Sequence, residues 1–195
     1  MNLKPPAAHY ARCADTIARR LRVLDTIASG ATYLDAELTA LHVSRIVEVI
    51  ASAAVCVAGN AHSPSGDRGT QDAARLLTDL HKQHLLVLPK AEDISRSTDP
   101  GFALVVSGAQ VRDLGVADLK QAYRASTEFL GETSPEAMEG EHLRRALADL
   151  RTWAMRLRGW LWNHAMFLED QALIVQMGML GTESFIATLR KDAVN

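Results

Sequence analysis

Apolar residues recur at steps of three and four through most of this chain. In residues 8–29 the apolar series is Cys13, Ile17, Leu21, Leu24 and Ala28. This spacing gathers apolar side chains on one side of an α-helix and leaves the other side polar. A helix with one apolar side must pack against another element, so the pattern predicts helices joined in a bundle.

Local signals mark where several of these helices begin or end. Gly30 is a natural end for the first helix, because glycine readily adopts the conformation that closes a helix. Thr70 is a candidate N-cap, and Thr133-Ser134-Pro135-Glu136 combines a hydroxyl cap with proline and an acid in the first turn. The later helices that we predict cover residues 34–58, 71–84, 116–130, a long segment from 134 past Trp160 as far as Gln176, and a short segment anchored by Phe185, Ile186 and Leu189.

Residues 85–107 allow two interpretations. The apolar runs Leu85–Pro89 and 102–106 could form a short β-ribbon. Thr98-Asp99-Pro100 instead reads as a cap followed by proline, with Gly108 as a stop, and we favour a short helix here. The fold class that follows is all-α: a bundle of five to seven helices in a single domain over residues 1–195, with one short β-ribbon near residues 85–107 as the exception to be tested.

Composition limits the classes of protein that this chain can belong to. It has 195 residues, 21 Lys plus Arg, 23 Asp plus Glu and a formal net charge of −2. A dedicated nucleic-acid binder is usually strongly basic, and a disordered chain is less apolar than the 48% found here. A domain of this size buries enough surface to fold without disulfides or structural metals.

We expect a cytoplasmic protein. Cys13 and Cys56 form no C-x-x-C pair, and two early prolines interrupt the apolar run that an export signal would need. The most apolar stretch, Val49–Gly59, is too short to span a bilayer, so no membrane partner is predicted. Residues 59–70 are rich in Gly, Ser and Pro, and they could serve either as a binding loop or as a connector.

The long helix after residue 134 carries the candidate binding surface. Three arginines lie seven residues apart beside its apolar face, and three tryptophans fall within ten residues. The residues that we assign to this surface are Arg144, Arg151, Arg158, Trp160 and Trp162. Such a surface suits RNA or an acidic protein partner, whereas the alternative is a core helix with a solvated cationic back. Trp162 points away from the apolar face, which favours a homo-oligomer.

One short motif suggests a catalytic alternative. Arg158-Gly-Trp-Leu-Trp-Asn-His164 resembles the R-x4–6-H motif of HEPN-domain proteins. These are small all-α dimers, many of them endoribonucleases, and some are paired with a nucleotidyltransferase antitoxin. The resemblance covers seven residues and implies that His164 would be the general base, with Arg158 stabilising the charge of the phosphate. His164 also falls on the apolar face of the predicted helix, where a hydrogen-bonded core histidine is the alternative.

Two histidines are weak candidates for metal ligands. His81 and His84 are three residues apart on a predicted helix, and His42 or His62 could complete a site. Their position in the last turn of a helix gives a simpler explanation, because the helix dipole favours histidine there. Gly-rich phosphate-binding motifs and the G-x-S-x-G motif are absent from the sequence, and no cofactor is predicted.

The hypothesis that these observations favour is a non-enzymatic helical module that self-associates and binds a macromolecular partner. A protein partner is expected first, and RNA is a further candidate. A HEPN-like, metal-independent endoribonuclease is the second hypothesis, with Arg158 and His164 as its catalytic residues. A metal-binding helical bundle is the third.

Overall fold

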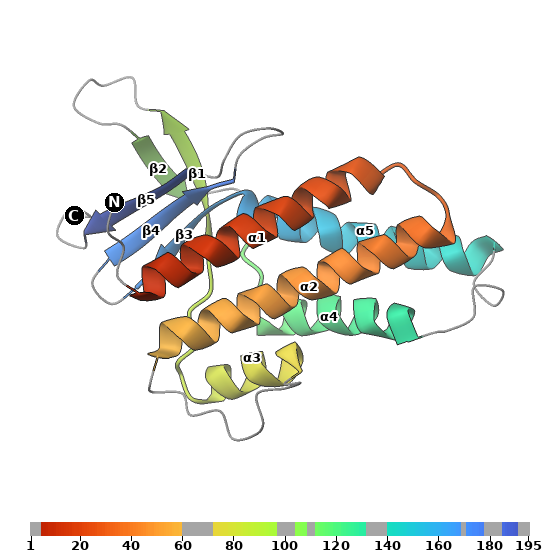
Figure 1. Ribbon diagram of the computed structural model, residues 1–195, viewed down its shortest axis with the longest axis horizontal. Coiled ribbons are helices and arrows are strands. Elements are labelled where there is room, and N and C mark those ends of the chain that lie inside the picture. The colour runs from red at the N-terminus through yellow and green to blue at the C-terminus, as the bar shows by residue number, and fades with distance from the viewer. Residues whose placement is uncertain are drawn as a thin grey trace.

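A computed structural model describes residues 5–59, 72–96, 104–108, 112–131, 140–168, 171–177 and 185–190. In chain order its elements are α1 (Pro5–Ile27), α2 (Tyr33–Ala58), α3 (Ala73–Lys82), β1 (Lys90–Arg96), β2 (Leu104–Gly108), α4 (Val116–Gly131), α5 (Gly140–Trp162), β3 (Asn163–Phe167), β4 (Gln171–Gln176) and β5 (Phe185–Arg190). The helices form a bundle, and the strands gather at one end of it (Figure 1). The prediction of a mainly helical bundle with a small β element is confirmed.

Helix α2 lies at the centre of the bundle and contacts the other four helices. Its N-terminus is fixed by a capping box: the Thr32 hydroxyl accepts a hydrogen bond from the Asp35 amide, and the Asp35 carboxylate accepts one from the Thr32 amide. By length and composition alone, α2 could cross a membrane, and half of its most apolar window is buried against the rest of the chain. The sequence did not indicate an apolar helix of this length, because the most apolar stretch begins only at Val49.

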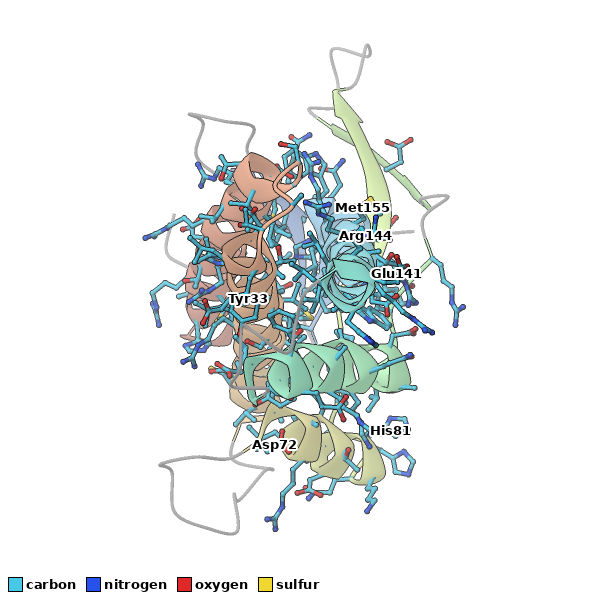
Figure 2. The ribbon with its side chains drawn as sticks, turned by 90° about the vertical axis from the view of Figure 1, so that its right-hand side faces the viewer. Tyr33, Asp72, His81, Glu141, Arg144 and Met155 are labelled. Atoms are coloured by element: carbon cyan, nitrogen blue, oxygen red, sulfur yellow. The ribbon has the colours of Figure 1, made fainter. Side chains whose placement is uncertain are left out.

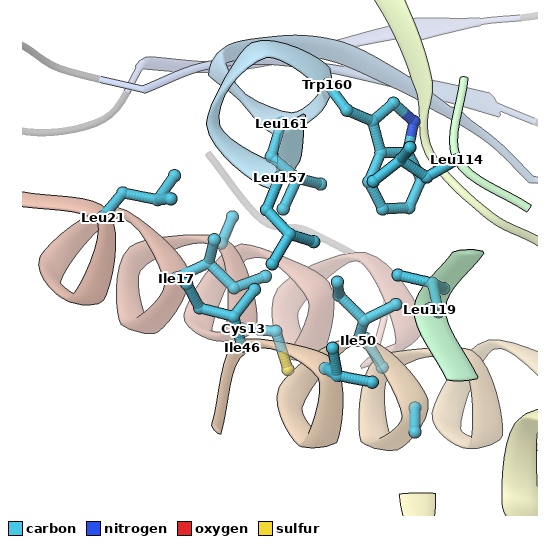
Figure 3. Packing of buried hydrophobic residues seen from close by; sticks show 14 of the residues in the cluster. Cys13, Ile17, Leu21, Ile46, Ile50, Leu114, Leu119, Leu157, Trp160 and Leu161 are labelled. Atoms are coloured by element: carbon cyan, nitrogen blue, oxygen red, sulfur yellow. The ribbon is translucent and has the colours of Figure 1, made fainter. Parts of the chain in front are cut away.

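The hydrophobic core lies where α5 meets α1, α2 and α4. Leu157, Trp160 and Leu161 of α5 point towards residues of the other three helices (Figure 3). All three side chains are fully buried. The indole N–H of Trp160 donates to the Pro89 carbonyl oxygen at 3.1 Å, so its polar atom is satisfied within the core. The predicted apolar face of this helix is therefore confirmed as its packing face.

The five strands form one antiparallel sheet in the order β2-β1-β3-β4-β5. Strand β1 connects the β2 edge of the sheet to the other three strands. Its residues Lys90 and Ala91 pair with β3, whereas residues 92–96 pair with β2. Helix α5 runs directly into β3, and the Met177 amide after β4 donates to the Trp162 carbonyl oxygen at 2.8 Å. The sheet is therefore tied to the C-terminal end of α5, next to the buried end of the helix.

Three helix predictions in the second half of the chain are wrong. Residues 104–108 form strand β2 rather than part of a short helix, so the β-ribbon was the better interpretation. Helix α5 ends at Trp162 instead of continuing to Gln176, and residues 185–190 form β5. In β4 the consecutive residues Ala172–Val175 are all buried. A strand covered on both faces has no apolar–polar alternation, so its periodicity resembles that of a buried helix.

Several predicted signals fall outside the described residues. They are the N-cap at Thr70, the helix start at Thr133–Glu136 and most of the glycine-rich segment 59–70. For α3 the structure shows a different cap, because the carboxylate of Asp72 accepts a hydrogen bond from the Ala74 amide at 2.9 Å. Aspartate serves in this position as well as threonine does.

Candidate functional site

The structure separates Arg158 and His164, the pair suggested by the short motif. Arg158 lies on the last turns of α5, whereas His164 lies on β3. The side chain of Arg158 is 47% exposed; it pairs with Asp25 of α1 at 3.2 Å and stacks over the Trp162 ring, 4.9 Å from its centroid. His164 is fully buried. The two residues therefore face different surroundings, one at the surface and one in the core.

His164 is a hydrogen-bonded core histidine. Its Nδ1 lies 2.8 Å from the Leu161 carbonyl oxygen, and its Nε2 lies 2.7 Å from the hydroxyl of Tyr10. A carbonyl can only accept, so Nδ1 carries the hydrogen and Nε2 accepts from the tyrosine hydroxyl. Burial lowers the pKa of His164 to about 4, although the bond to Leu161 opposes this shift. Both ring nitrogens are thus occupied by internal partners.

Burial acts on the partner of His164 as well. Tyr10 is buried, and burial raises the pKa of its hydroxyl well above the usual value, with a smaller contribution from Cys13. The hydroxyl therefore remains protonated and remains a donor. The two rings also meet edge to face, with ring centroids 5.8 Å apart and an angle of 81° between their planes. This pair joins α1 to β3 and explains how a histidine is accommodated in the core.

The structure brings Arg151 and Arg158 to a common pocket between α1, α2 and α5. The pocket has a volume of about 290 Å³. Its walls come from the three helices, and the lining residues are Leu21, Leu24, Asp25, Ala28, Thr39, Arg151, Ala154, Met155 and Arg158. Most of these side chains are apolar, and the charged ones are two arginines and one aspartate. The pocket therefore combines an apolar interior with a net positive charge.

Arg151 is held in place by the turn between α1 and α2. One of its Nη atoms donates to the Gly30 carbonyl oxygen. Its Nε is buried and has no hydrogen-bond partner within the described part of the chain. Hydrogen bonds from Thr32 lower the pKa of Asp35, and the nearby positive charge of Arg151 adds a smaller lowering. The guanidinium is thus fixed at the wall of the pocket by contacts that do not depend on a ligand.

The other members of the predicted surface lie apart from the pocket. Trp160 is fully buried in the core, so it belongs to the packing of α5 and not to an exposed surface. Trp162 is half-buried beneath Arg158. Arg144 pairs with Glu141 at 2.8 Å near the start of α5. In Figure 2 Arg144 and Glu141 lie close together on α5, which also carries Met155. Of the five predicted residues, only Arg151 and Arg158 line the pocket.

His81 and His84, the candidate metal ligands, are exposed, and the described residues place no further ligands beside them. His81 lies in the last turn of α3, and His84 follows the helix with a φ of 56°, in the left-handed region. Within the described residues there is no group of three or more His, Cys, Asp or Glu side chains that could hold a metal ion. His62, which the sequence offered as a further ligand, lies outside the described residues.

Sequence reasoning missed the part of the pocket that α1 and α2 contribute. Asp25 and Thr39 carried no motif, and their distances in sequence from α5 gave no sign that they would lie beside it. Met155 was missed because it lies off the apolar face of α5; the residue is 66% exposed and lines the pocket. The seven-residue spacing of the arginines was the only sequence signal that led to this site.

No protein-family model matches the chain, and neither a curated protein nor a solved structure matches it. Function is therefore inferred from the chemistry of the site itself.

Proposed function

We propose that this protein is a non-enzymatic helical binding module that presents the face between α1 and α5 to an acidic, partly apolar segment of a partner macromolecule. The observation that carries the proposal is the pocket shared by Arg151 and Arg158. Two guanidinium groups beside an apolar hollow can pair with carboxylates while the hollow receives an apolar side chain.

The charges around the pocket support an acidic partner. Asp25 neutralises one of the two arginines in part, which leaves a net positive charge in the lining. The exposed side chain of Met155 adds an adaptable apolar contact at the same place. Arginine and methionine are both enriched in protein interfaces relative to the rest of the surface.

A protein partner fits this face better than RNA does. Recognition of RNA normally uses rows of cationic side chains along the backbone together with aromatic rings that stack on bases. Here Arg144 is paired with Glu141, and Trp162 is covered by Arg158. The formal net charge of −2 also disfavours non-specific attraction to a polyanion.

The positions of Arg158 and His164 give no support to a ribonuclease site. A general base must come within hydrogen-bond reach of the proton that it removes, directly or through one water. His164 is fully buried and bonded through both ring nitrogens, and its pKa of about 4 makes it a weak base. A metal site has no support either, because His81 and His84 are exposed and no third ligand joins them among the described residues.

Self-association and location in the cytoplasm are parts of the same proposal. Leu34 and Leu41 are 59% and 37% exposed, and they lie seven residues apart on α2. Exposed apolar side chains on one helix face favour contact with another copy. Packing of α2 against four helices of its own chain supports a role as a core helix rather than as a membrane span.

Affinity capture with matched variants tests the proposal. The wild-type protein, the double variant Arg151→Gln/Arg158→Gln and the control Arg124→Gln are immobilised and exposed to a lysate with and without ribonuclease. Arg124 lies on α4 and pairs with Glu128, away from the pocket. We expect proteins that bind to wild type and control, are lost with the double variant and are unaffected by ribonuclease. Equal retention by all three proteins would contradict the proposal.

Light scattering of the purified protein tests self-association separately. We expect a mass above that of one 21.2 kDa chain. The variant Leu34→Lys/Leu41→Lys should shift that mass towards the monomer, because charges on an apolar contact are costly to desolvate. A wild-type protein that remains monomeric at all accessible concentrations would remove self-association from the proposal.

A further inference from the structure

We infer that the pocket between α1, α2 and α5 is a binding site for a small amphipathic monocarboxylate, in which one carboxylate is joined to an apolar body. The inference rests on the proposed function for the role of this pocket, and it adds a small-molecule ligand. Binding of a small acid is measured on the isolated protein, so its failure and the failure of partner capture can be told apart.

The volume of the pocket sets the size of the ligand. It measures about 290 Å³. An apolar cavity of roughly 150 Å³ accommodates benzene, which has six non-hydrogen atoms. Twice that volume corresponds to about ten to twelve non-hydrogen atoms. Octanoate, with eight carbons and two oxygens, falls in this range and is the simplest probe of the class.

The walls of the pocket set the chemistry of the ligand body. Leu21 and Leu24 of α1 form one side, and Ala154 and Met155 of α5 form the other. These side chains offer no hydrogen bonds to a ligand, so a polar or sugar-like body would lose its hydration without compensation. An alkyl or aryl body gains free energy from the same burial.

The charges set the ligand's head group. The lining contains Arg151, Arg158 and Asp25, which together carry one net positive charge. A single carboxylate balances that charge, whereas a cation would meet two guanidinium groups. Arginine also matches a carboxylate geometrically, because its planar N–H groups can form two parallel hydrogen bonds.

The orientation of the ligand follows from the exposure of the two arginines. The side chain of Arg158 is 47% exposed, so it stands at the solvent edge of the pocket, where it also pairs with Asp25 at 3.2 Å. Arg151 is less exposed and is already held by the Gly30 carbonyl. An amphipathic acid that enters with its apolar end first leaves the carboxylate at Arg158, while Arg151 adds positive potential from within. Arg158→Gln should therefore weaken binding more than Arg151→Gln.

Titration of the purified protein with octanoate tests this site, with calorimetry and methyl NMR of carbon-13 methionine as the two measurements. The Met155 methyl signal is assigned from Met155→Leu. We expect saturable binding that shifts this signal. Octanol lacks the charge and acetate lacks the apolar body, so both should bind at least about ten-fold more weakly, which corresponds to one missing interaction of ordinary strength.

Matched variants locate the site. Arg158→Gln should weaken octanoate binding at least about ten-fold, Arg151→Gln should weaken it less, and Arg124→Gln should leave it unchanged. Ala154→Phe should abolish binding by filling the pocket, and circular dichroism establishes that each variant is folded. The absence of saturable binding at about millimolar octanoate would overturn the inference. Equal binding of octanol and octanoate, or full binding by Arg158→Gln, would overturn it as well.

Discussion

Burial of the neutral His164 imidazole makes the stability of this protein depend on pH. The folded protein holds the histidine with a pKa of about 4, against 6.5 for the free side chain. Between these values the unfolded chain binds one more proton than the folded chain at this residue. The contribution of the neutral His164 to the free energy of unfolding is therefore complete above pH 6.5, and it is lost as the pH falls towards 4.

The magnitude follows from the two pKa values. The full difference corresponds to a ceiling of roughly 3 kcal/mol in the free energy of unfolding. At pH 5 the unfolded histidine is almost fully protonated and the folded one is mostly neutral, so the loss relative to pH 8 is about 2 kcal/mol. That loss is a large part of the stability of an ordinary domain, which is about 5–15 kcal/mol.

Urea denaturation at about pH 8 and pH 5, followed by far-UV circular dichroism, measures this loss. His164→Gln removes the titrating group, so the variant should lose about 2 kcal/mol less than the wild type between the two pH values. His81→Gln replaces an exposed histidine as a control. This variant should lose as much free energy of unfolding between the two pH values as the wild type does. NMR titration of the His164 ring gives an independent measurement if His164→Gln does not fold. Equal losses in wild type and His164→Gln, or a His164 ring that titrates near 6.5, would refute the reasoning.

Three further destabilising substitutions, two of them with a matched control, test the local structure by chemical denaturation. Thr32→Ala removes the cap of α2 and should cost about 1 kcal/mol, whereas Thr32→Ser should retain most of the stability. Gly30→Ala places a Cβ against the carboxylate of Asp35 and should break the capping box, at a cost of at least about 1 kcal/mol. A Cβ at Gly131 meets no neighbouring atom among the described residues, so Gly131→Ala should be neutral or mildly stabilising. Leu157→Ala leaves a cavity at a fully buried position and should cost about 2–5 kcal/mol. Losses below about 0.5 kcal/mol for any of the three destabilising changes would contradict the packing described.

The sequence predicted the helices well where one side of a helix remained exposed. In α1 and α5 polar residues alternate with the apolar ones at helical spacing, so the pattern identifies both the element and its buried face. The end of α5 could not be predicted in the same way. The apolar residues beyond this end, Ala165–Met166 and Ala172–Val175, are buried, and a short apolar run is compatible with a helix and with a strand. Hydrogen bonds to β1 and β4 determine that this segment is extended.

For the candidate site, the sequence supplied the arginines and the structure supplied their partners. The seven-residue spacing places Arg151 and Arg158 on one side of a helix, about 10.5 Å apart along its axis. Nothing in that spacing shows that Asp25 neutralises one of them or that Leu21 and Leu24 form an apolar wall opposite. The same limit explains His164, whose tyrosine partner is 154 residues away in the chain.

The sequence by itself thus determined the helices before residue 131 and the body of α5, together with their apolar sides, because periodicity is a local property of neighbouring residues. Only the tertiary structure decided that the chain continues from α5 into a sheet, that His164 is sealed against Tyr10 and that two arginines share a pocket with α1. Each of these features depends on contacts between residues far apart in the chain, and such contacts form only when the packed elements exclude water between them.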